Sequence, residues 1–71
     1  MSWVEKVKKY VEGFKYYSED DEYFVIIPKK EVDGVREWLE DYVWSVEGDW
    51  LSYELHEIAN APEYKILMLS I

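Results

Sequence analysis

The spacing of apolar residues changes from one segment of this 71-residue chain to the next, and this pattern limits the fold more than any other feature of the sequence. In residues 3–16 and 30–45, apolar side chains recur every three or four positions, which predicts two amphipathic helices. Residues 23–27, 50–58 and 64–71 are short segments rich in aromatic and aliphatic residues, which predicts three strands. The predicted element order is α-β-α-β-β.

Connection rules turn this order into a topology. The helix between the first two strands makes them parallel, and the turn at residues 59–62 makes the third strand antiparallel to the second. The third strand is the most hydrophobic, so we expect it at the centre of the sheet, in the strand order 1-3-2. The sequence therefore predicts a single α+β domain over residues 1–71, with two helices packed on a three-stranded antiparallel sheet.

Two details of the helices are also predicted. Ser2 and Glu5 have the spacing of a capping box, in which Ser2 accepts from the backbone and the Glu5 carboxylate reaches back to Ser2. Trp38 and Leu39 occupy the middle of the apolar stripe of the second helix, so we expect both to be buried.

The first and third strands are apolar on both faces, whereas the second has one polar face. Two helices fill one side of so narrow a sheet, which would leave the other side apolar and in need of a partner. We therefore expect a homodimer in which two sheets pack face to face about a two-fold axis. The alternative is a monomer with one helix on each face. The candidate interface residues are Phe24, Ile26, Leu67, Leu69 and Ile71.

The chain is acidic, with 16 Asp and Glu against 8 Lys and Arg and a formal net charge of −8. This balance argues against direct binding of nucleic acid, which needs clustered basic residues. An acidic surface on and after the second helix is instead suited to imitate the phosphates of a nucleic acid and occupy a basic groove on another protein. The residues of this candidate acidic surface are Asp33, Glu37, Glu40, Asp41 and Glu47.

Metal and cofactor chemistry have little support in the sequence. There is no cysteine and His56 is the only histidine, so neither a thiolate zinc site nor a histidine cluster is expected. The acidic run at residues 18–22 lacks the glycine and the alternating spacing of an EF-hand loop. With no glycine-rich phosphate loop and no nucleophile beside a base, we expect no cofactor and no catalysis.

Composition also suggests a location and a habitat. No apolar run approaches the roughly 20 residues that cross a bilayer, and the first residues become charged at once, so we expect a cytoplasmic protein without a membrane span or signal peptide. Gln and Thr are absent and Asn60 is the only asparagine, a depletion that resembles hyperthermophile proteins.

Together these features predict a non-catalytic interaction or structural module that forms homo-oligomers. Two alternatives remain: an acidic decoy for a nucleic-acid-binding protein, and a small-ligand binder that uses an aromatic-lined crevice between subunits.

Overall fold

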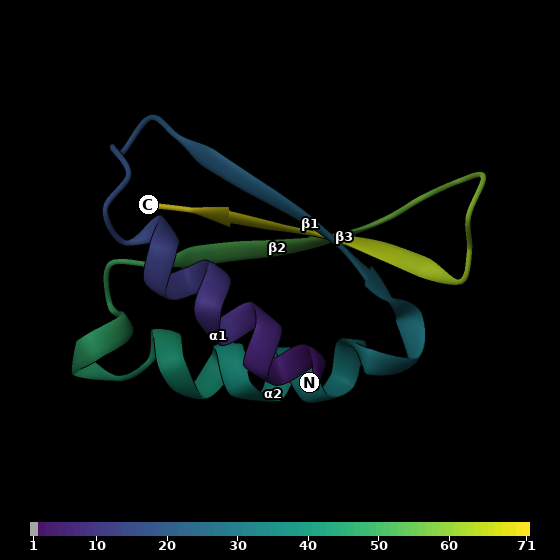
Figure 1. The fold of residues 1–71 in the computed structure, drawn as a ribbon, viewed down its shortest axis with the longest axis horizontal. Coiled ribbons are helices and arrows are strands. Elements are labelled where there is room, and N and C mark those ends of the chain that lie inside the picture. The colour runs from purple at the N-terminus through teal and green to yellow at the C-terminus, as the bar shows by residue number, and fades with distance from the viewer. Residues whose placement is uncertain (1) are drawn as a thin grey trace.

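A computed structural model describes residues 2–71, and its elements follow one another in the predicted order (Figure 1). The helices are α1 (Trp3–Phe14) and α2 (Val32–Val43). The strands are β1 (Glu22–Pro28), β2 (Ser52–Glu57) and β3 (Tyr64–Ser70), and short 3-10 turns η1 (Lys29–Glu31) and η2 (Val46–Gly48) flank α2. The sheet is antiparallel with the order β1-β3-β2, which confirms the predicted topology.

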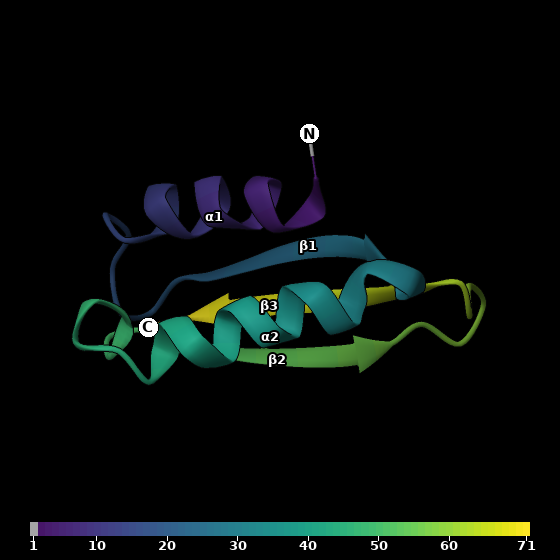
Figure 2. The same ribbon diagram turned by 90° about the horizontal axis from the view of Figure 1, so that it is seen from below.

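The molecule has two layers, because both helices lie on the same side of the sheet (Figure 1). Seen from the helix side, α1 runs along the β1 edge and α2 lies across β3 and β2 (Figure 2). The hydrophobic core fills the space between the layers and is built from both helices, from β1 and β3, and from Leu51, the residue before β2. Tyr53 and Leu55 of β2 are partly buried against it. Its buried residues are Val7, Val11, Phe14, Val25, Ile27, Val32, Val35, Leu39, Leu51, Leu67 and Leu69.

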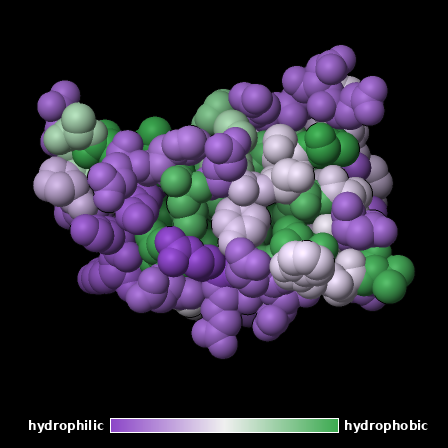
Figure 3. Space-filling view, turned by 180° about the vertical axis from the view of Figure 1, so that it is seen from behind, coloured by the Kyte–Doolittle hydropathy of each residue, from purple (hydrophilic) through white to green (hydrophobic). Residues whose placement is uncertain are grey.

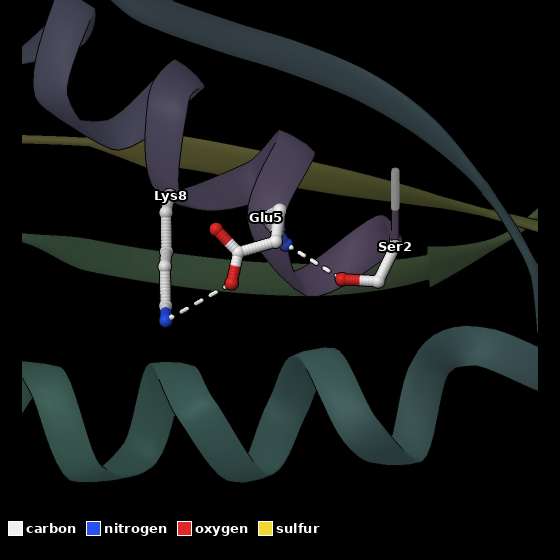
Figure 4. Close-up of polar contacts among 3 residues, drawn as sticks. All are labelled: Ser2, Glu5 and Lys8. Carbon is white, nitrogen blue, oxygen red and sulfur yellow. Dashed lines mark hydrogen bonds and ion pairs between the residues drawn. The ribbon is translucent and has the colours of Figure 1, made fainter.

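Ser2 caps α1 by accepting a hydrogen bond from the Glu5 backbone N–H, with 3.2 Å between N and Oγ (Figure 4). Glu5 does not complete the expected capping box, because its carboxylate lies 3.5 Å from Lys8 Nζ one turn further along. Lys8 points from α1 toward α2, where its Nζ lies 5.8 Å from the centre of the Trp38 ring. The cap and the ion pair therefore belong to the first turns of α1, and Lys8 links this end to α2 through the Trp38 ring.

The link between β1 and α2 is hydrogen-bonded to the turn that precedes β3. After Pro28 the chain makes the turn η1, so α2 begins two residues later than the sequence pattern predicts. The Lys29 backbone N–H donates a hydrogen bond to the Glu63 carbonyl oxygen at 2.8 Å. This bond holds the end of β1 against the β2–β3 hairpin.

Within residues 2–71, neither helix has the length and apolar character needed to cross a bilayer.

Candidate functional site

One face of the sheet lies opposite the helices and carries a row of apolar side chains. Cross-strand partners in a sheet point to the same face, and Phe24 pairs with Met68 while Ile26 pairs with Ile66. Phe24 and Ile26 are 59% and 58% exposed, and Ile66 and Met68 are half-buried. We call these four residues the open-face patch. They form a continuous apolar surface on β1 and β3 that neither helix covers.

The polar part of this face belongs to β2. Glu54 pairs with Met68 and His56 pairs with Ile66, so both side chains stand beside the patch. His56 Nε2 lies 3.6 Å from Glu54 Oε1, and both side chains are more than half exposed. The open face therefore changes from apolar on β1 and β3 to polar on β2.

The open face ends in a depression beyond Ile26 and Ile66. Pro28 and Tyr64 are cross-strand partners with the same orientation as the patch residues, and Tyr64 is 40% exposed. A hollow of about 680 Å³ is lined by these two residues and by Lys29, Lys30 and Glu63. The patch thus has a basic end, formed by Lys29 and Lys30, both of which are exposed.

The candidate interface from the sequence proves to be divided between two faces, and this prediction is partly wrong. Phe24 and Ile26 lie on the open face as expected. Leu67 and Leu69 are fully buried beneath the helices, because the register pairs Leu67 with the buried Val25. They are core residues and are not available to a partner.

Ile71 follows β3 and is 37% exposed, with the side-chain parity of Leu69. The candidate interface did not include Ile66 and Met68, which take the place of the two leucines on the open face. The antiparallel register was the signal that could have found them. In that register, Phe24 and Ile26 have to share a face with the even-numbered residues of β3.

All five residues of the candidate acidic surface are exposed. Asp33, Glu37 and Asp41 are spaced by four residues and so share one side of α2, whereas Glu47 lies in η2. Glu40 accepts a hydrogen bond from the hydroxyl of Tyr53 in β2. Burial raises the pKa of Tyr53 to about 12, and the hydrogen bond to Glu40 and its negative charge act in the same direction.

The acidic run before β1 is held by a local turn. The backbone N–H and the hydroxyl of Ser18 both donate to the Asp21 carboxylate, each at 3.1 Å. Asp21 therefore stabilises the turn between α1 and β1. Among residues 2–71, no group of three or more His, Asp or Glu side chains is arranged to hold a metal ion.

A second exposed apolar area lies on the face of the molecule that is seen in Figure 3. Viewed from behind, hydrophobic and weakly polar side chains gather over the end of α2, η2 and the start of β2 (Figure 3). Trp44 and Val46 are 84% and 90% exposed there, and a shallow hollow of about 320 Å³ runs from Val43 to Tyr53. Hydrophilic side chains lie among them in the same view (Figure 3).

Comparison with protein-family models, with curated proteins and with solved structures gave no match.

Proposed function

We propose that this protein is a non-catalytic interaction module that self-associates through the open-face patch. The observation that carries the proposal is the exposure of Phe24 and Ile26 beside Ile66 and Met68, on a sheet face with no helix over it. Contiguous exposed apolar patches on small proteins often mark interaction sites.

A second copy would also supply stability that a chain of this length lacks. Domains of about 70 residues bury a smaller fraction of their surface than larger ones, and each apolar Å² removed from water contributes roughly 25 cal/mol. Two sheets packed about 10 Å apart would remove the patch of both copies from water with the same set of residues.

The size of the face sets the expected strength of association. A strand of seven residues is about 23 Å long, and three strands spaced about 4.8 Å apart give a face roughly 14 Å wide. This footprint is well below the roughly 800 Å² that each partner buries in a standard interface. We therefore expect a weak, concentration-dependent dimer with a dissociation constant in the micromolar range or above.

Sedimentation equilibrium from about 10 µM to about 1 mM tests the proposal. The unaltered chain should show a mass that rises from monomer toward dimer across this range. Ile26→Lys places a charge in the patch without touching the core, and should leave a folded monomer. Val46→Lys is the matched control, because Val46 is an exposed apolar residue outside the sheet and its replacement should not change the mass. An unaltered chain that stays monomeric at about 1 mM would refute self-association.

The acidic surface provides a further control. Replacing Glu37 and Asp41 with Lys changes two exposed side chains on α2, on the layer opposite the patch. Self-association through the sheet should be unaffected. Under the alternative of an acidic decoy, the unaltered chain would bind a basic, nucleic-acid-binding protein in a salt-sensitive way and this variant would not.

A further inference from the structure

The two ends of β1 carry opposite charges. Acidic residues precede and begin the strand at residues 20–22, the apolar Phe24 and Ile26 lie in its middle, and Lys29 and Lys30 follow its end. Val25 is the midpoint of this arrangement. An acidic end and a basic end therefore lie at similar distances of about 10–13 Å along the strand from one central residue.

The other two strands share this midpoint. Val25 pairs with Leu67 of β3, and Leu67 pairs with Leu55 of β2. On the open face, Met68 and Ile66 stand one residue to either side of this line, as do Glu54 and His56. A half-turn of the sheet about this line brings the position of Met68 onto that of Ile66 in β3, and the position of Glu54 onto that of His56 in β2. An apolar residue then meets an apolar residue, and an acid meets a histidine.

Two orientations of a two-fold axis pack two sheets face to face with their strands aligned. An axis along the strands and over the central β3 would place β1 of one copy over β2 of the other, and so set Phe24 and Ile26 against the polar Glu54–His56 pair. An axis across the strands places each strand over its own copy in the reverse direction. Of these two orientations, only the second puts Phe24 and Ile26 against apolar residues.

Resting on the proposed function, we propose that the partner at the open face is a second copy of this chain, related by a two-fold axis that runs across the strands over Val25, Leu67 and Leu55. Phe24 of one copy then faces Ile26 of the other, and Glu54 faces His56. The depression lined by Pro28 and Tyr64 with its two lysines receives the acidic start of the other copy's β1.

Twist places the closest pairing near the axis, since packed sheets cross at about 30°. The charges at the two ends of β1 meet at the rim of the interface, where they select the orientation and the partner more than they add affinity. Glu63, which also lines the depression, lies beside the lysines and offsets part of their charge. Because these contacts are exposed to solvent, added salt should weaken them.

Charge exchange between two variants tests this arrangement. Lys29→Glu with Lys30→Glu makes both ends of β1 acidic. Asp20→Lys with Glu22→Lys makes both ends basic and keeps Asp21, which holds the turn with Ser18. Each variant alone faces like charges at both symmetric contacts, so its dimer should dissociate about tenfold more readily than the unaltered one at low salt. In an equimolar mixture, every acidic end meets a basic end, and a heterodimer should form with the original affinity within about threefold.

The heterodimer is measured by native mass spectrometry and by sedimentation of the mixture, after circular dichroism has confirmed that each variant is folded. Lys9→Glu with Lys15→Glu is the charge-matched control, at two exposed positions in and directly after α1. It should neither weaken the dimer nor pair preferentially with the Asp20→Lys, Glu22→Lys variant. A dimer of the unaltered chain whose charge variants do not pair would overturn this axis while leaving self-association intact. A monomeric unaltered chain would remove both proposals.

Discussion

The indole N–H of Trp50 donates a hydrogen bond to the Tyr42 hydroxyl, with 3.3 Å between Nε1 and Oη. The two rings meet edge to face, with their centres 6.4 Å apart and their planes at 87°. The Tyr42 carbonyl oxygen accepts a second set of bonds, from the backbone N–H of Ser45 at 3.0 Å and from its hydroxyl at 2.6 Å. Tyr42 thereby joins the end of α2 to η2 and to the residue that leads into β2.

The same carbonyl makes Gly48 sensitive to substitution. A Cβ atom at position 48 would lie 1.9 Å from the Tyr42 oxygen, and this is backbone that cannot move aside. The requirement is for space, because no glycine of the described residues has a positive φ. We expect Gly48→Ala to lower the free energy of unfolding by about 1–3 kcal/mol or more, measured by urea denaturation. A change below about 0.5 kcal/mol would show that the turn can open without cost.

Gly34 should behave in the opposite way. It lies inside α2, and a Cβ atom there would meet only Val4 Cγ2 at 3.8 Å, an ordinary van der Waals distance. Alanine restricts the unfolded chain and favours the helix, so Gly34→Ala should raise the free energy of unfolding by about 0.5–1 kcal/mol. Thermal denaturation followed by circular dichroism should show a midpoint several degrees higher. A lower midpoint would mean that α1 and α2 pack more closely at this point than the structure has them.

The middle of α2 gives a third prediction, because Leu39 is fully buried and Trp38 is only half-buried. Trp38 stacks on Tyr42, with ring centres 5.1 Å apart, at the edge of the core. Leu39→Ala should cost about 2–5 kcal/mol, whereas Trp38→Ala should cost about 1–2 kcal/mol despite removing the larger side chain. Equilibrium denaturation of both variants measures the two losses of unfolding free energy. A larger loss for Trp38→Ala than for Leu39→Ala would contradict the half-buried position of Trp38.

Tyr53 gives a prediction about alkaline pH. The pKa of Tyr53 is raised to about 12 in the folded protein, chiefly by burial, against the ordinary value of 10.0. Folding therefore favours the neutral phenol, so its contribution to stability is full below pH 10 and is lost as the pH rises toward 12.

The urea concentration at the midpoint of unfolding should fall less between pH 10 and pH 12 in Tyr53→Phe than in the unaltered chain. Tyr16→Phe is the matched control, since the Tyr16 ring is 88% exposed, and its curve should follow that of the unaltered chain. If the Tyr53→Phe curve also runs parallel to the unaltered one, the hydroxyl is not coupled to folding.

Much of the fold follows from local pattern. The changes of apolar spacing predicted all five elements and their order, because helix and strand place side chains at periods of 3.6 and 2 that short segments display directly. The central position of β3 followed from its hydrophobicity and from the short hairpin that joins it to β2. Element ends were less accurate. η1 begins at Lys29, whose backbone N–H bonds to the distant Glu63, and η2 is held by local bonds of Ser45 to Tyr42 and Gly48.

Only the tertiary structure decided which side of the sheet is open. The alternation along β3 separates Leu67 and Leu69 from Ile66 and Met68, but both sets are apolar and either could face the helices. Which set faces the helices depends on the side of the sheet on which α1 and α2 pack, and the apolar spacing within each segment does not determine that side. The pairing of Phe24 with Met68 then assembles the patch from two strands that lie about forty residues apart, because a sheet face is defined by its register across strands and not by neighbours along the chain.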